Sequence, residues 1–285
     1  MHGSLVVKDA KSAHCKRRRP QLKAVTINAL TGAGFILAKN TFMYSTNIRI
    51  VLVHPTHPGN IGGAARAMKN MGLTNLHLVA PIRFPDAEAS ARAAGAEDVL
   101  VAACMHPSLD QALESCSLVI GTSARARSIS WPSLDPRTCA EKLVAHGASA
   151  ALLFGRERMG LTNAELDRCH YVVSIPTNPD FPSLNLAGAV QIMAYEIFLA
   201  ATNAVFAGKA TPLASQPLAN HEDLQKFYQH LEQVLIQIAF LDPANPRKLM
   251  RRLIRLFNRA ELDQNELNIL RGILTAVQQH PSNNT

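Results

Sequence analysis

From residue 47 onward, short apolar runs alternate with longer amphipathic stretches. Runs of strand length, rich in Ile, Val and Leu, lie at 48–53, 75–79, 117–123, 150–155 and 171–175. Between them, apolar residues recur at helical spacing. The pattern therefore predicts strands that alternate with helices, which is typical of an α/β fold whose parallel sheet is covered on both faces.

Capping residues indicate where the helices begin. We expect a helix over 58–72, with Asn60 as its N-cap and Gly72 as its terminator. Similar signals predict further helices after Asp86 and Ser108, from Asp135-Pro136 to about residue 145, at the capping box of Thr162 and Glu165, and along the apolar run 184–200.

Ligands of parallel sheets bind beyond the carboxyl ends of the strands. Four loops leave the predicted strands at that edge, and all are rich in Gly, Pro, Asn, Ser and Arg. These loops span 54–60, 122–135, 155–161 and 176–183.

The periodicity stops near residue 201, and a second unit follows. Residues 201–220 gain Ala, Pro and Thr and are interpreted as a linker. Helical spacing returns at 221–239, 246–259 and 264–279. A helical module of about 65 residues is only marginally stable alone, so we expect it to dock or to bind a partner. The predicted domains are a leader at 1–42, a catalytic domain at 43–202, a linker at 203–220 and a helical module at 221–285.

The net charge of +8 suggests nucleic-acid binding only until it is located along the chain. Residues 1–42 hold eight Lys and Arg against one acid, so +7 lies there and +1 remains for the other residues. The overall charge therefore does not support RNA binding by the folded part. We expect the leader to be a weakly ordered extension, so that deleting it preserves solubility and activity.

Several classes of protein are disfavoured. The chain has no GxGxxG, GxxxxGK[ST], HExxH or GxSxG motif. The five cysteines form no CxxC pair, which favours free thiols in a reducing cytosol, and no metal site is predicted. No run approaches the roughly 20 apolar residues that span a bilayer, so no membrane segment is expected.

Three strand-end loops are candidates for a ligand site. They comprise 121–124, 154–161 and 175–186. Backbone amides at strand ends can recognise an adenine edge without charge, and Gly155 and Gly160 let a ligand approach the backbone. Composition alone leaves two interpretations equally open: a site for a planar base, or ordinary turns.

A resemblance favours the first interpretation. Residues 57–72, 152–166 and 174–196 resemble the three ordered motifs of the SPOUT methyltransferase superfamily. With 48–53, 121–137 and 267–274, they are similar to the bacterial TrmJ family, tRNA ribose 2′-O-methyltransferases acting at position 32 of the anticodon loop. The resemblance covers about residues 47–274.

The resemblance implies a fold that periodicity does not predict. SPOUT domains carry a C-terminal trefoil knot, expected here at roughly residues 150–200, although knots are rare. It also implies S-adenosylmethionine as cofactor, with contacts from Thr122, Ser123, Ala124, Gly155, Ile175, Ser183, Leu184 and Asn185.

The resemblance places Arg66 in the active site, where the ribose 2′-hydroxyl attacks a methyl sulfonium. Arginine is normally protonated and cannot accept a proton, so we favour positioning of the ribose and a phosphate over base catalysis. We expect Arg66→Ala to abolish methylation while cofactor affinity is retained. Asn60 is predicted to cap its helix, to orient the substrate, or both.

Basic residues are candidates for RNA contacts or for plain surface charge. Arg125 and Arg127 border one cofactor loop. Arg156 and Arg158 border another, where Glu157 is a possible ion-pair partner for either. The C-terminal cluster favours RNA binding, because no acid interrupts it and its members share one broad helical face opposite Leu249, Leu253, Leu256 and Phe257. The cluster comprises Arg247, Lys248, Arg251, Arg252, Arg255 and Arg259.

The resemblance also implies a homodimer, with helices 60–71 and 184–200 as contact faces, and tRNA as substrate. The expected location of the protein is the cytoplasm. Two alternatives stay open: a related methyltransferase acting on rRNA or another tRNA site, and a catalytically inactive RNA-binding scaffold.

Overall fold

The computed structural model describes residues 47–124, 131–206 and 217–279. The leader prediction for 1–42, and the positions of Arg125 and Arg127, lie outside the described residues.

Seven parallel strands form one sheet in the order β3-β2-β1-β6-β4-β7-β5. The central strands are almost wholly buried and apolar because helices cover both faces. The predicted parallel α/β architecture is thereby confirmed. The strands are β1 (Ile48–Val53), β2 (Leu76–Val79), β3 (Cys104–His106), β4 (Leu118–Thr122), β5 (Ser133–Leu134), β6 (Ala150–Phe154) and β7 (Tyr171–Val173).

The strand order departs from chain order in the second half of the sheet. Strand β6 lies between β1 and β4, and β7 lies between β4 and β5. Ile50 is aligned with Leu152 of β6, and Gly121 of β4 is aligned with both Leu153 and Val172. The carboxyl ends of β4, β6 and β7 are therefore neighbours. The trefoil knot stays a prediction.

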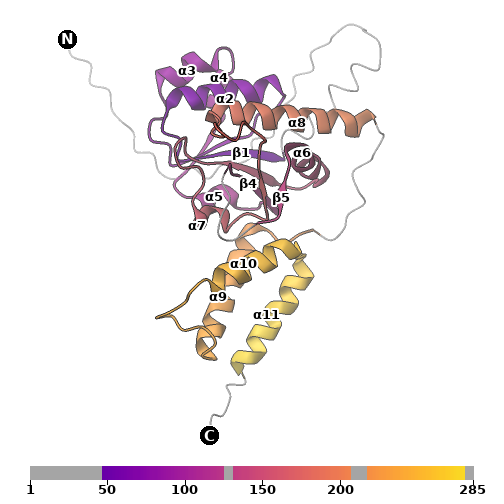
Figure 1. Cartoon of the computed structure of the whole chain (residues 1–285). Coiled ribbons are helices and arrows are strands. Elements are labelled where there is room, and N and C mark those ends of the chain that lie inside the picture. The colour runs from indigo at the N-terminus through magenta and orange to yellow at the C-terminus, as the bar shows by residue number, and fades with distance from the viewer. Residues whose placement is uncertain (1–46, 125–130, 207–216, 280–285) are drawn as a thin grey trace, which may run out of the picture.

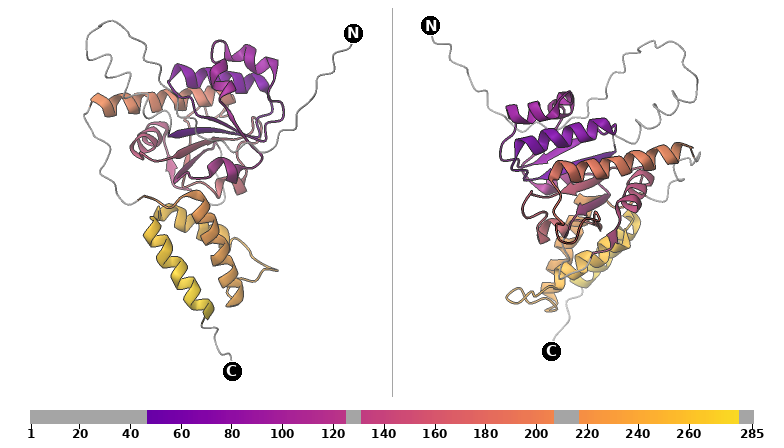
Figure 2. Two further views of the ribbon diagram at one scale, coloured as in Figure 1. Left: turned by 180° about the vertical axis from the view of Figure 1, so that it is seen from behind. Right: turned by 45° about the horizontal axis from the view of Figure 1, so that its top comes forward.

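Helices cover the sheet in two layers (Figures 1 and 2). One face carries α2, α6 and α8, with α3 and α4 packed outside α2, and the opposite face carries α5 and α7. The helices of this domain are α2 (Pro58–Asn70), α3 (Ala87–Ala93), α4 (Glu97–Val101), α5 (Leu109–Leu113), α6 (Pro136–Ala145), α7 (Asn163–Leu166) and α8 (Leu186–Phe206).

Small residues let α2 pack closely between its neighbours. A Cβ atom on Gly62 would lie 2.1 Å from the carbonyl oxygen of Ala89 in α3. A Cβ atom on Gly63 would lie 2.9 Å from Cβ of Ala187 in α8. The Gly-Gly pair therefore sets the distance from α2 to both helices.

Most predicted helix starts are confirmed by capping hydrogen bonds. The side chains of Asp86, Ser108 and Asp135 accept from backbone N–H groups of the following turn, and Thr162 and Glu165 form the predicted capping box. The prediction for Asn60 is wrong. Helix α2 begins at Pro58 with His57 as N-cap, because proline is pre-organised for the first helical position.

The remaining helices form the C-terminal module: α9 (His221–Gln237), α10 (Leu249–Ala260) and α11 (Gln264–Gln279). They enclose a small core of their own, in which Phe227 of α9 meets Phe257 of α10 edge to face with ring centroids 5.0 Å apart. Figure 1 shows this module beside the α5–α7 face of the sheet. Helix α8 continues to Phe206, past the predicted domain end at 202. The domain boundaries themselves stay a prediction.

Within the described ranges, one helix is long and apolar enough, by length and composition alone, to cross a membrane. It is Leu186–Ala204 of α8. Core helices of soluble proteins meet the same criteria, so this is weak evidence for a membrane span. Here α8 packs on α2 and α6 and contributes Val190, Met193 and Ile197 to the main core.

Candidate active site

A pocket opens where β4, β6 and β7 end. Its walls are the three loops that follow these strands, together with Leu186 and Ala189 at the start of α8. The structure thus gathers residues that lie more than 60 positions apart in the sequence. Seven of the predicted cofactor residues line it: Thr122, Ser123, Ala124, Gly155, Ile175, Ser183 and Leu184.

The loop after β6 is a tight hairpin that requires glycine at two positions. Arg156 and Gly160 form an isolated antiparallel bridge. A Cβ atom on Gly155 would lie 2.1 Å from the carbonyl carbon of Gly160, and Gly160 itself has φ +65°. Backbone therefore forms this wall of the pocket, as the sequence predicted from the two glycines.

The loop after β4 is held by both neighbouring strands. The Thr122 hydroxyl donates to the carbonyl of Leu153 at 2.9 Å, and the Ser123 amide donates to the carbonyl of Val173 at 3.0 Å. This wall is therefore fixed relative to β6 and β7.

Glu157 connects the pocket to the start of α2. Its carboxylate accepts from the Thr56 hydroxyl at 2.7 Å and from the Thr56 and His57 amides at 3.1 Å. The Asn60 amide group donates to it at 3.1 Å. An anion at this position also interacts favourably with the positive end of the helix.

These contacts determine the charge of Glu157. Partial burial by itself would raise the pKa of the carboxyl group, but the hydrogen bonds from Thr56, Asn60 and the His57 amide lower the pKa to about 2. Such a carboxylate stays ionised at neutral pH and is a weak base, so it is not suited to take a proton from a ribose hydroxyl.

Asn60 joins this carboxylate to α8. Its side-chain oxygen accepts from the Asn185 amide group at 2.9 Å. The oxygen of Asn185 in turn accepts from the Ala187 and Gly188 amides at 2.9 and 3.3 Å and caps α8. Asn185, the eighth predicted cofactor residue, thus lies next to the pocket rather than in its wall. A substrate role for Asn60 stays a prediction.

Arg66 lies outside this pocket, on the exposed side of α2. Within the part of the chain that the structure describes, its guanidinium has neither a hydrogen-bond nor an ion-pair partner. Gly63, one turn earlier, packs against Ala187, so this stretch of α2 runs beside the start of α8. Among the described residues, nothing therefore covers this exposed side chain.

Comparison with known proteins identifies the family. A model described as the SpoU rRNA methylase family matches residues 47–195, which include all three pocket loops. The chain belongs to the SpoU rRNA methylase family. It is thus a member of a family of RNA methyltransferases. A second model, the C-terminal domain of the tRNA methyltransferase TrmJ, matches residues 222–285 of this SpoU-family chain.

Curated relatives of this SpoU-family chain match along nearly their whole length. The tRNA (cytidine/uridine-2′-O-)-methyltransferase TrmJ of Pectobacterium atrosepticum is 54% identical over 235 residues, 82% of this chain and 97% of the relative. The enzyme of the same name from Klebsiella pneumoniae is 52% identical over 243 residues, with the same two coverages.

Solved structures agree with the fold. The crystal structure of TrmJ from Z. mobilis ZM4 superposes with a TM-score of 0.71 at 33% identity, covering 81% of this chain and 98% of that one. A probable methylase family protein from Haemophilus influenzae superposes with a TM-score of 0.56 at 46% identity, covering 82% and 97%.

In this SpoU-family pocket, Arg156 pairs with Glu165, whereas the sequence suggested Glu157 as its possible partner. Arg156, which lines the pocket, has both Glu165 oxygens 3.0 Å from its Nη1 atom. Glu157 instead binds the start of α2. The sequence missed this role of Glu157 because its partners lie about 100 residues earlier in the chain. The one signal in the sequence for this role was that Glu157 is an acidic residue within the motif segment 152–166.

The predicted common helical face of the C-terminal cations is partly wrong, because Arg247 precedes α10 of this SpoU-family protein. Arg247 and Arg252 are exposed and line a shallow concavity beside Phe240, and Arg255 is half-buried. Arg251 points elsewhere, toward Asp167 at 2.6 Å. The predicted opposing stripe is also partly wrong, because Leu256 is 46% exposed. RNA contact by Arg247, Arg251, Arg252 and Arg255 stays a prediction.

No cluster of three or more metal-ligating side chains occurs among the described residues.

Proposed function

We propose that this protein transfers the methyl group of S-adenosylmethionine to the ribose 2′-hydroxyl of cytidine or uridine at position 32 of tRNA. The observation that carries the proposal is the strand-end pocket, in a chain that is 54% identical to a tRNA (cytidine/uridine-2′-O-)-methyltransferase. Position 32 rests on the motif resemblance to the TrmJ family. Action on tRNA also makes the cytoplasm the expected location.

The composition of the pocket suits this cofactor. Apolar side chains of Ile175, Leu184 and Ala189 offer surfaces for a planar base, and the backbone of the 122–124 and 155–161 loops offers neutral hydrogen-bonding groups. The carboxylate of Glu157, which lies in one wall, is already bound to α2.

The cofactor supplies an electrophilic methyl group on a sulfonium. When held by the three pocket loops, it would supply this methyl group to the ribose 2′-oxygen and leave as a neutral thioether. The hydroxyl proton would pass to water, since Glu157 is a weak base and Arg66 is already protonated. Arg66 remains protonated in our proposal and orients the ribose through an adjacent phosphate, since a guanidinium binds phosphate oxygens in pairs.

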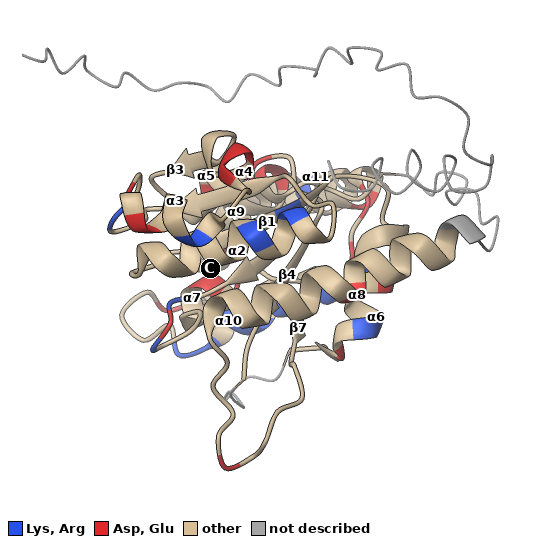
Figure 3. Cartoon of the chain, turned by 90° about the horizontal axis from the view of Figure 1, so that it is seen from above, with Lys and Arg blue, Asp and Glu red and all other residues tan. Residues whose placement is uncertain are grey.

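We also propose a homodimer, in which Arg66 of one protomer approaches the pocket of its partner. Helix α8 supports this arrangement, because it carries Glu196 as its one charged residue and exposes Tyr195 and Phe198 by 48% and 36%. Figure 3 shows the sparse charge along α8. A two-fold pair is the common solution for such a surface.

Ribosomal RNA is the second candidate substrate, favoured by the description of the family model. Transfer of tritiated methyl groups to RNA transcripts distinguishes the two. We expect transfer to a tRNA carrying cytidine or uridine at position 32, and none when that nucleotide is 2′-deoxy. Equal transfer to both tRNAs contradicts position 32, and transfer to rRNA alone supports the second candidate. No transfer to any RNA favours an inactive scaffold.

A further inference from the structure

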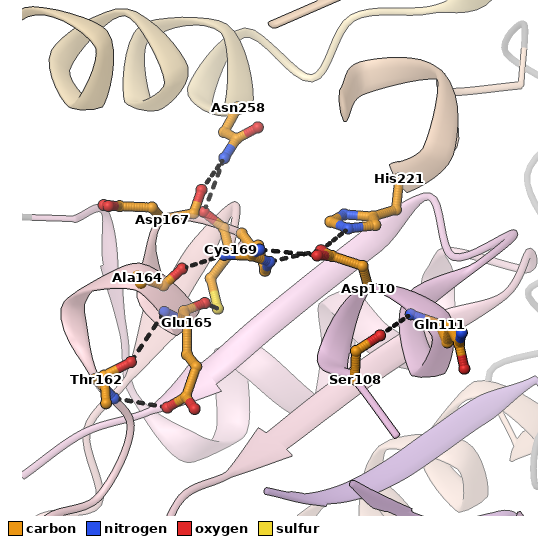
Figure 4. Close-up of polar contacts among 11 residues, drawn as sticks. Ser108, Asp110, Gln111, Thr162, Ala164, Glu165, Asp167, Cys169, His221 and Asn258 are labelled. Atoms are coloured by element: carbon orange, nitrogen blue, oxygen red, sulfur yellow. Dashed lines mark hydrogen bonds and ion pairs between the residues drawn. The ribbon is translucent and has the colours of Figure 1, made fainter. Parts of the chain in front are cut away.

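The C-terminal module is joined to the methyltransferase domain by polar contacts centred on two acids. Asp110 belongs to α5, and Asp167 directly follows α7. Figure 4 shows His221 of α9 directed at Asp110, and Asn258 of α10 directed at the backbone around Asp167. These two acids and their partners are called the docking contacts below.

Asp110 fixes the start of the module. It accepts from Nε and Nη2 of Arg168 at 2.6 and 2.8 Å and from His221 Nε2 at 3.0 Å. The hydrogen bonds from Arg168 and then His221 hold the pKa of Asp110 well below its usual range. The amide of His221 also donates to the carbonyl of Cys116 at 2.8 Å. The His221 side chain is only 4% exposed, so little water reaches the imidazole that binds Asp110.

Asp167 fixes α10. Arg251 binds it through Nε at 2.6 Å and Nη2 at 3.1 Å, a two-point geometry that restricts rotation. Asn258, two turns later, donates to the carbonyls of Asp167 and Cys169 at 3.1 and 3.3 Å, and it accepts from Tyr228 of α9 at 2.6 Å. A buried amide satisfied on both sides specifies one arrangement of the two domains.

A third contact lies apart from the first two. Lys142 of α6 pairs with Glu261, the C-cap of α10, at 2.9 Å. The module is therefore held at α5, after α7 and at α6, and three separate attachments determine its orientation.

This orientation directs the other cations of α10, and Lys248 just before it, away from the interface. At about 100° per residue, Arg251 and Asn258 lie within roughly 20° of each other, and Arg252 and Arg259 lie about 100° further round. Lys248, Arg252 and Arg259 are exposed, and Arg255 is half-buried between the two faces. These four residues are called the cationic stripe.

Helix α7 connects the stripe to the pocket. It has four residues and is therefore about 6 Å long. Glu165 binds the pocket residue Arg156, and Asp167, two positions on, binds Arg251. This short helix and the residue that follows it thus hold one wall of the pocket and the helix that carries most of the stripe.

We infer that Asp167 and Asp110 are positioning residues, which hold the cationic stripe at a fixed distance from the pocket so that a tRNA bound along the stripe presents its target ribose to the pocket. The inference rests on the proposed function. The stripe binds the phosphate backbone, and the docking contacts select which nucleotide reaches the pocket.

Charge makes the test specific. Asp167→Asn removes a negative charge, so simple electrostatics predicts tighter RNA binding. Loss of positioning predicts the opposite: kcat/KM for tRNA falls by ten- to a hundredfold. The slope of log Kd against log salt also becomes shallower by about 1 or more, although every cation of the stripe is still present. Arg252→Gln should make this slope shallower by removing one cation of the stripe. Its neighbour Arg251→Gln should instead give the same loss of kcat/KM and of slope as Asp167→Asn.

Asp98→Asn is the matched control, because Asp98 also pairs with one cation, Lys69, but on the exposed surface of α4. It should leave both measurements unchanged. The charge-reversed pair Asp167→Arg with Arg251→Asp should recover part of the lost kcat/KM. If Asp167→Asn fails to fold by thermal unfolding, Asp110→Asn tests the half-exposed docking contact in its place.

Unchanged or tighter tRNA binding by a folded Asp167→Asn protein, with an unaltered salt slope, would overturn the inference. Methyl transfer by the unmodified protein is measured in parallel. If that protein transfers no methyl group, the proposed function fails, whereas the binding and salt measurements still decide whether the docking contacts position the stripe.

Discussion

At the scale of single residues, the chemistry of the site depends on which polar groups are already engaged. Glu157, Asn60 and Asn185 satisfy one another and two helix ends. Arg66 has no such partner within the described residues, and in the proposed function it is the side chain that orients the substrate. The resemblance selected Arg66 from the sequence. The partners of Glu157 could not be foreseen, because they lie about 100 positions away.

Substitution of Arg66 should affect the chemical step. We expect Arg66→Ala to reduce kcat by at least about a hundredfold while the Kd for S-adenosylmethionine changes little, because the side chain lies outside the pocket. Calorimetry and single-turnover methylation measure the two quantities. Arg92→Ala, at another exposed arginine, should retain activity. Full activity of Arg66→Ala would refute the assigned role.

Glu157 should make stability depend on pH. Its pKa of about 2 in the folded protein lies below the ordinary value of 4.5. Its ionised form therefore stabilises the protein above about pH 4.5, and this contribution is lost as the pH falls through about 2. We expect Glu157→Gln to cost about 1 kcal/mol at pH 7, after allowance for solvent screening, and less at pH 3. Urea unfolding at both pH values measures this, and an equal cost at both would contradict it.

At the scale of elements, local signals predicted helices better than short strands. Asp86, Ser108, Asp135 and Thr162 mark helix starts because capping involves neighbouring residues only. Strands β3 and β5 and helix α4 were missed. The two strands have three and two residues, too few to show periodicity, and they depend on partners elsewhere in the sheet. The three pocket loops were predicted because parallel strands end at one edge.

The hairpin after β6 should tolerate no side chain at Gly155. A Cβ atom there would meet backbone at 2.1 Å, so Gly155→Ala must open the hairpin. We expect a loss of about 1–3 kcal/mol in unfolding free energy and loss of cofactor binding. Gly272→Ala in α11, where nothing lies within 4 Å, should instead stabilise by up to about 1 kcal/mol. Thermal unfolding and cofactor titration compare them, and similar effects of both would contradict the role of the hairpin.

At the scale of the whole molecule, the sequence separated a catalytic domain from a helical module but could not relate the two. Their contacts pair residues such as Asp167 and Arg251, 84 positions apart, and Arg251 reads in sequence as one more member of a basic cluster. Only the packing of α9–α11 turns it away from the others. The expected knot and the proposed dimer likewise depend on global topology and on a second chain, which periodicity does not encode.

The exposed apolar side of α8 should control assembly. We expect Tyr195→Glu with Phe198→Glu to give monomers and to abolish methylation, since in the proposed dimer each pocket needs the partner's arginine. Light scattering after gel filtration measures the mass. Ile238→Glu, at an apolar residue of similar exposure in the C-terminal module, is the control. An active monomeric variant would contradict a shared site.

The position of β6 has a consequence for synthesis of the chain. In the described sheet, strands β1 and β4 are not paired with each other, and both pair with β6. A nascent chain that ends before residue 150 can therefore form only the β1–β2–β3 half of the sheet, with β4 unattached. The ligand edge must wait longer, for β7 and the first turn of α8. A ribosome-bound intermediate should thus expose the edge of β1 to solvent and to chaperones until β6, just past the middle of the chain, emerges.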